Sequence, residues 1–143
     1  MLIIQLIVTI VVMIIIYMIF ALIDYEGGFD GFFGMALIQP IIALIVSSIS
    51  ALACFVIGLP IRLSANIFSW WSNRLYIQLA MLMIGITLLI LSIIPQNMDQ
   101  VILSGDLNNT KMIPDKLFSL SGWFITAFSL MHILEMFQRF LNI

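Results

Sequence analysis

Four long apolar stretches make up most of this 143-residue chain, and their length limits what it can fold into. They cover residues 1–23, 32–59, 74–94 and 117–137. An α-helix of about 20 residues, at a rise of about 1.5 Å per residue, crosses the roughly 30 Å hydrocarbon core of a bilayer. We therefore expect an all-α membrane protein in which four transmembrane helices form a compact antiparallel bundle with short loops.

The composition excludes a water-soluble fold. Hydrophobic residues make up 64% of the chain and charged residues 8%, whereas soluble domains carry roughly 25% charged residues. The longest polar stretch, residues 96–116, is too short for a second domain, which needs about 40 residues to fold alone. We expect one integral membrane domain over residues 1–143. Because Cys54 is the only cysteine, an intramolecular disulfide and thiol-pair redox chemistry are excluded.

Proline and tryptophan mark the ends and bends of these stretches. Pro40 lies inside the second stretch, so either a continuous helix is kinked there or a helix begins there after a short interfacial segment. The continuous helix is favoured. The sequence Gly58-Leu59-Pro60 predicts the end of that helix at residue 59. The connector over residues 61–73 carries Trp70, Trp71 and Arg62, a composition typical of the headgroup level of a membrane.

The distribution of basic residues predicts the orientation. An even number of crossings puts both termini on one side. Arg62, Arg74 and Arg139 fall on that side, and Lys111 and Lys116 fall on the other. Because cytoplasmic loops carry the excess of Lys and Arg, we expect cytoplasmic N- and C-termini in a bacterial inner membrane.

Small residues recur on one face of the second stretch and, less extensively, on the fourth. Such faces let helix backbones approach closely in lipid, where they commonly mediate helix association. We expect the second helix to pack against the fourth, or either of them to pack against another protein. The predicted helix-interface residues are Ala43, Ser47, Ser50, Ala51, Cys54 and Gly58 on the second stretch, and Ser119, Gly122, Thr126 and Ser129 on the fourth.

Polar residues within the stretches are few. Gln5 and Thr9 share one face of the first, where a hydrogen bond between helices is the favoured role. His132 and Glu135 lie three residues apart near the end of the fourth, and a metal site needs three or four ligands. We therefore expect no metal, cofactor or catalytic residue. The favoured interpretation puts His132 at the headgroup boundary, with Glu135 and Arg139 as an exposed pair; a functional role for His132 and Glu135 is disfavoured.

Three classes of function remain, in decreasing order of preference. The first is a non-catalytic accessory subunit, or an immunity-type protector, that binds another membrane protein. The second is a self-associating channel, carrier or holin-like protein for a small neutral solute. The third, an intramembrane enzyme, has only His132 and Glu135 to work with. The expected partners are the lipid bilayer and another membrane protein or a second copy of the chain; no basic patch indicates nucleic acid.

Overall fold

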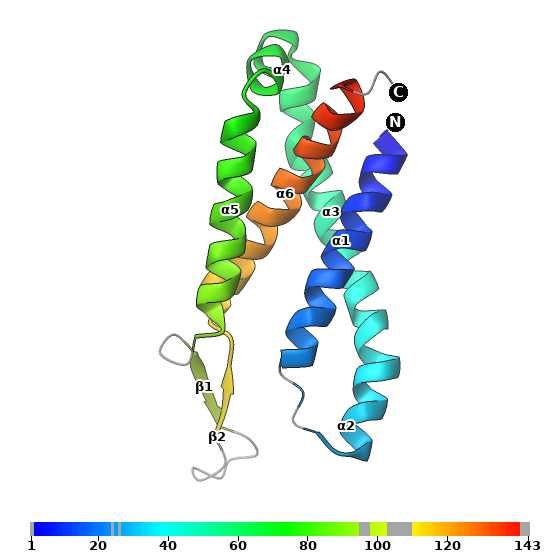
Figure 1. The fold of residues 1–143 in the computed structure, drawn as a ribbon, viewed down its shortest axis with the longest axis vertical. Helices are drawn as coiled ribbons and strands as arrows, with labels where there is room; N and C mark the ends of the chain where they lie inside the picture. Colours follow the sequence, from blue (N-terminus) through cyan, green and yellow to red (C-terminus); the bar gives the residue numbers. More distant parts are fainter. Residues whose placement is uncertain (1, 24, 26, 95–97, 103–109, 141–143) are drawn as a thin grey trace.

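Helices dominate the fold, which is known from a computed structural model that describes residues 2–23, 25, 27–94, 98–102 and 110–140. In Figure 1, α4, the start of α1 and the end of α6 lie at one end of the molecule, the terminal end; α2 and the two strands lie at the other, the loop end. The helices are α1 (Leu2–Ile23), α2 (Phe29–Phe33), the π-helical turn η1 (Gly34–Ile38), α3 (Gln39–Leu63), α4 (Ala65–Ser72), α5 (Leu75–Ser92) and α6 (Lys116–Phe140). The strands are β1 (Asp99–Ile102) and β2 (Thr110–Ile113).

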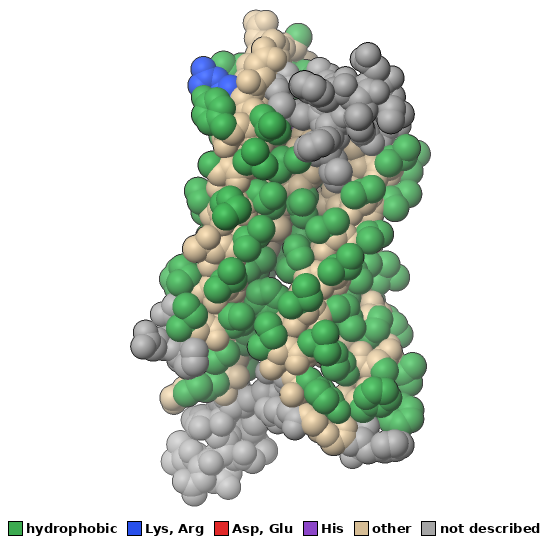
Figure 2. Space-filling view, viewed as in Figure 1, with side chains coloured by type: hydrophobic (Ala, Val, Ile, Leu, Met, Phe, Trp, Pro, Cys, Tyr) green, Lys and Arg blue, Asp and Glu red, His purple; other side chains and the backbone are tan. Residues whose placement is uncertain are grey.

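The long helices have the length and composition of membrane spans. Within the described residues, three helical segments are long and apolar enough to cross a bilayer: Ile3–Ile23, Gly31–Leu63 and Leu75–Ser92. The face of the molecule shown in Figure 2 is covered mainly by hydrophobic side chains, and its Lys or Arg atoms lie near the terminal end. The expectation of a mostly helical protein associated with a membrane is therefore confirmed.

The second apolar stretch continues through Pro40 as one helical segment, so the continuous helix is the interpretation that the structure adopts. The π-helical turn η1 directly precedes α3, and the backbone N–H of Gln39 donates to the carbonyl of Gly34. Pro40 lies in the first turn of α3, and since proline has no N–H to donate, the helical ladder changes at this point from the π pattern of η1 to the α pattern of α3. The π turn accommodates one extra residue per turn and so changes the direction in which Gln39 is presented.

The predicted helix end at residue 59 is wrong, because α3 contains Pro60 and ends at Leu63. A proline inside a helix costs one backbone hydrogen bond, and near a membrane boundary other groups can satisfy the freed carbonyl. The helix ends where Ser64 turns to an extended conformation, with φ −93° and ψ 107°. The connector that follows is also more regular than expected, since most of it forms α4.

The loop before α6 contains regular structure that the prediction of an all-α fold with short loops did not include. Strands β1 and β2 pair antiparallel, with Asp99 opposite Ile113 and Ile102 opposite Thr110. Their β-branched residues favour an extended backbone. The N–H of Asp115 donates to the carbonyl of Ser92 at 3.1 Å, which ties the two ends of this loop together. The Asp115 carboxylate then caps α6 by accepting from the N–H of Phe118 at 2.7 Å.

Helix α6 is central to the packing. It contacts α5, α3 and α1, and α1 also packs against α3. A buried cluster joins three of these helices through Met13 of α1, Cys54 of α3, and Ala127 and Met131 of α6. The buried polar groups therefore lie between packed helices, and α6 contacts each of the other three long helices.

Candidate functional site: buried polar groups and a loop-end cleft

The small-residue face of α3 is turned inward. Its buried residues are Ala43, Ser47, Ser50, Ala51, Cys54 and Gly58. On α6, Gly122, Thr126 and Ser129 are buried and Ser119 is half-buried. The Cys54 thiol donates to the carbonyl of Phe124 on α6 at 3.8 Å, and a Cβ added at Gly58 would lie 3.1 Å from Cε1 of His132. These contacts bring the small face of α3 directly against α6.

A chain of contacts links α3, α6 and α1. The indole N–H of Trp123 donates to the Ser50 hydroxyl at 2.7 Å, and that hydroxyl donates to the carbonyl of Val46 at 2.8 Å. The Trp123 ring also meets Tyr17 edge-on, with centroids 6.2 Å apart. Tyr17 in turn donates its hydroxyl to Oε1 of Gln39 at 3.0 Å. The side chain of Trp123 therefore occupies the space between α3 and α1.

Glycines bring α5 and α6 into backbone contact. A Cβ added at Gly122 would lie 2.8 Å from the Gly85 carbonyl oxygen and 2.9 Å from the Leu89 nitrogen. A Cβ added at Gly85 would lie 2.9 Å from the Thr126 nitrogen. Real Cβ contacts are essentially never this short, so only glycine permits this approach.

Several hydroxyls are buried without a hydrogen bond. Thr9 and Ser47 are both 0% exposed. Neither hydroxyl oxygen has a partner within the described residues, and the same holds for Thr126. Gln5, the other polar residue predicted on α1, is also buried. An unsatisfied buried polar group costs free energy, so these hydroxyls are candidate positions for water or solute.

His132 is 2% exposed and lies inside the terminal end rather than facing the headgroups. Its Nδ1 lies 2.8 Å from the Phe128 carbonyl. Because a carbonyl only accepts, Nδ1 carries the proton. Nε2 is buried with no hydrogen-bond partner in the described part of the chain, and the ring lies 4.2 Å from Phe128 and 5.8 Å from Trp71, centroid to centroid. The side chain of Glu135 is outside the described residues, so the predicted pair is not tested.

Cations at the terminal end rest on aromatic rings. The guanidinium of Arg62 lies 5.3 Å from the centre of the Phe55 ring, and that of Arg74 lies 4.6 Å from the centre of Trp70. Arg74 also donates to the Tyr76 hydroxyl at 3.2 Å. Cation–π contacts of this kind stabilise charge near apolar surroundings, which suits a helix end at a membrane boundary.

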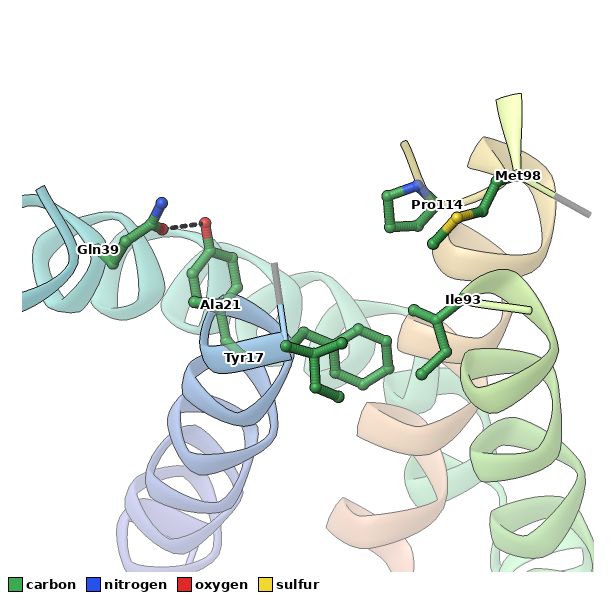
Figure 3. Close-up of a pocket in the computed structure, with 8 residues that line it drawn as sticks. Tyr17, Ala21, Gln39, Ile93, Met98 and Pro114 are labelled. Atoms are coloured by element: carbon green, nitrogen blue, oxygen red, sulfur yellow. Dashed lines mark hydrogen bonds between the residues drawn. The ribbon is translucent and has the colours of Figure 1, made fainter. Parts of the chain in front are cut away.

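A cleft of about 230 Å³ lies at the loop end, between α1 and η1–α3 on one side and the ends of α5 and β2 on the other. Figure 3 shows the hydrogen-bonded Tyr17 and Gln39 on one side, facing Ile93, Met98 and Pro114 across the cleft. The lining residues are Tyr17, Phe20, Ala21, Ile23, Gln39, Ile93, Met98 and Pro114. The cleft combines apolar walls with one polar pair.

Over the residues that the structure describes, no group of three or more His, Cys, Asp or Glu side chains could hold a metal ion. Comparison of the chain with protein-family models, with curated proteins and with solved structures gives no match.

Sequence reasoning missed several residues of this interior. Gly85 and Ser92 are buried on α5 together with Gln78, and the three lie seven residues apart, a spacing that marks one helix face. That spacing was the signal available in the sequence. Trp123 gave no comparable signal, because its role depends on the position of Ser50 in a distant helix.

Proposed function

We propose that this protein is a non-catalytic accessory subunit, or an immunity-type protector, that binds another integral membrane protein. The uneven burial of its long helices is the observation that carries this proposal. Only 11% of the membrane-spanning window of α1 is buried, against 33% for the segment through α3 and 22% for α5. Most of the length of α1 is therefore available to contact a second protein in the membrane. The exposed ridge of α1 consists of Ile3, Ile7, Val11, Ile15 and Ile19.

The position of charge supports a role without catalysis. The described charged side chains are those of Arg62, Arg74, Asp115 and Lys116, and each lies at or near the end of a helix. Enzymes and transporters that act within the membrane commonly place ionisable groups inside their spans. An interaction subunit needs none, and the buried imidazole of His132 is an exception among the described side chains.

We further propose that α6 is a fourth crossing, so that four helices form an antiparallel bundle with both termini cytoplasmic, in a bacterial inner membrane. The 25-residue length of α6 supports this, as does the common location of the start of α1 and the end of α6 in Figure 1. A reporter enzyme fused after Ile143 should be active only in its cytoplasmic form. Activity of a periplasmic reporter at that position would contradict the topology.

The test of the function is gentle purification from the native membrane, with identification of every protein that co-elutes. We expect one membrane protein in stoichiometric amount. The double change Ile7→Ala and Ile15→Ala should release it, because association in lipid depends on close packing. The matched control is Ile84→Ala with Ile90→Ala on α5; the four side chains are 53–54% exposed. Equal recovery with both double variants would show that the ridge of α1 is not the binding surface.

A second candidate is a self-associating channel or carrier for a small neutral solute. The buried hydroxyls of Thr9, Ser47 and Thr126, which have no hydrogen-bond partner in the described part of the chain, favour it, because a path for a neutral solute needs hydrogen-bonding groups without charge. The same purification separates the two candidates. A closed homo-oligomer without a foreign protein would favour the channel, and solute flux into liposomes would then be the next measurement.

A further inference from the structure

The loop-end cleft lies where helices end. Ile23 is the last residue of α1, Ile93 follows the last residue of α5, and Pro114 directly precedes the turn into α6. In a protein that spans a membrane, such a level corresponds to the boundary between headgroups and acyl chains. The cleft is therefore within reach of the lipids around the protein.

The size of the cleft sets what it can hold. Pockets for whole small molecules measure roughly 300–1,000 Å³, and this cleft measures about 230 Å³. A partner helix, about 10 Å across with its side chains, is also too large. Its apolar walls, formed by residues such as Phe20, Ile23 and Ile93, suit one flexible aliphatic chain that belongs to a larger molecule.

The polar pair adds a chemical requirement. Tyr17 donates to Oε1 of Gln39, so the amide nitrogen of Gln39 keeps its two N–H donors. Among the described residues, the side-chain hydrogen bond of Gln39 is the one with Tyr17, and its amide nitrogen is not among the fully buried polar atoms, so a bound molecule can reach it. A carbonyl oxygen next to an aliphatic chain would complete the pair, and the acyl ester of a phospholipid has this arrangement. Lys116, exposed at the start of α6, adds a cation at the same end of the molecule, and a cation there attracts lipid phosphate.

We propose that the loop-end cleft binds one acyl chain of a phospholipid, whose ester carbonyl accepts a hydrogen bond from the Gln39 amide. This lipid site does not depend on the partner surface of α1, since the cleft is lined by other residues. The bound lipid covers the side chains that line the gap between the α1–α3 pair and the end of α5.

The first experiment counts retained lipid. The delipidated protein is reconstituted in vesicles of phosphatidylethanolamine and phosphatidylglycerol, extracted again, and weighed by native mass spectrometry. We expect one retained phospholipid per chain. Ala21→Leu, which fills the cleft, should abolish retention, whereas Ala80→Leu adds the same side chain at an exposed position of α5 and should leave retention unchanged. Equal retention by the two variants, or no retained lipid in the wild type, would overturn the proposal.

The second experiment tests the carbonyl and remains informative if Ala21→Leu fails to fold. Hydrogen bonds in a membrane are worth about 0.6–1.7 kcal/mol, so Gln39→Met should lower retention about three- to eighteenfold. A diether phospholipid, which lacks ester carbonyls, should lower wild-type retention by a similar factor and should lower that of Gln39→Met no further. If Gln39→Met and the diether lipid lower retention by separate factors that multiply when combined, the Gln39 amide does not bind the ester carbonyl and the proposed contact is overturned. A photocrosslinker at position 21 that captures a polypeptide instead of lipid would also overturn it.

Discussion

The pair α5–α6 and the pair α1–α3 are held together in different ways. Where α5 crosses α6, both helices contribute glycine, and the backbones touch at Gly85 and Gly122. Where α1 meets α3, only α3 contributes a small face, since α1 has no glycine and buries the larger side chains of Gln5, Thr9 and Met13. The first contact is between backbones, and the second is between side chains and a small-residue surface.

This difference indicates how each pair responds to change. A backbone contact has no rotamer to adjust, so any added atom must separate the helices. A contact made by side chains can repack, because the side chains can change rotamer. We therefore expect α5–α6 to be the rigid part of the molecule and α1–α3 the adaptable part.

The largest effect is expected for Gly122→Ala. The added methyl would lie 2.8 Å and 2.9 Å from backbone atoms of α5, so the helices must move apart, at a cost of about 1–3 kcal/mol in the free energy of unfolding. Equilibrium unfolding in mixed micelles measures it. Gly34→Ala is the control, because an added Cβ there meets nothing within 4 Å. If Gly122→Ala and Gly34→Ala cost the same free energy of unfolding, the backbone contact between α5 and α6 would be no more sensitive to an added methyl than an uncrowded helical position.

A smaller effect is expected for Ser50→Ala, which deprives the Trp123 indole of its acceptor. A hydrogen bond between membrane helices contributes about 0.6–1.7 kcal/mol, and the same unfolding measurement should show a loss in this range. Ser129→Ala is the matched control, because the Ser129 hydroxyl donates to the Ile125 carbonyl of its own helix. If Ser129→Ala costs as much as Ser50→Ala, the contact between α6 and α3 adds no stability of its own.

The smallest effect is expected for Ser47→Ala, which removes a buried hydroxyl that has no partner within the described residues. Its loss should change the free energy of unfolding by less than about 0.5 kcal/mol or stabilise the protein, since no hydrogen bond is broken. A loss above about 1 kcal/mol would show that the hydroxyl is satisfied by water, which would support a hydrated path along α1–α3.

The membrane setting and the long helices could be predicted from the sequence because a bilayer demands about 20 consecutive apolar residues. The spacing of small residues also selects the same six positions of α3 that are buried. Both signals are local and periodic, so a single stretch of sequence contains them. The sequence favoured passage of the helix through Pro40, but it did not indicate the π-helical turn that precedes this residue.

The remaining features depend on contacts between distant segments. Gly85 is a single glycine in an apolar helix, and its importance follows only from the register that puts it on Gly122. Pro60 looks like a helix end in the sequence, yet α3 continues to Leu63. Likewise, the burial of His132 depends on Trp71 from α4 and Gly58 from α3. No periodicity within one stretch contains this information.

The contacts of α6 with α5, α3 and α1 have a consequence for biogenesis. Chains are made from the N-terminus, so α6 is the last of these helices to leave the ribosome. Until α6 is inserted, the Ser50 hydroxyl on α3 lacks its donor, the Trp123 indole. The face of α5 around Gly85 likewise lacks the backbone of Gly122, and both surfaces contact lipid, other helices or an insertion factor instead. Premature termination before α6 would leave these surfaces uncovered, and such a nascent chain should be a preferred substrate for membrane quality-control proteases.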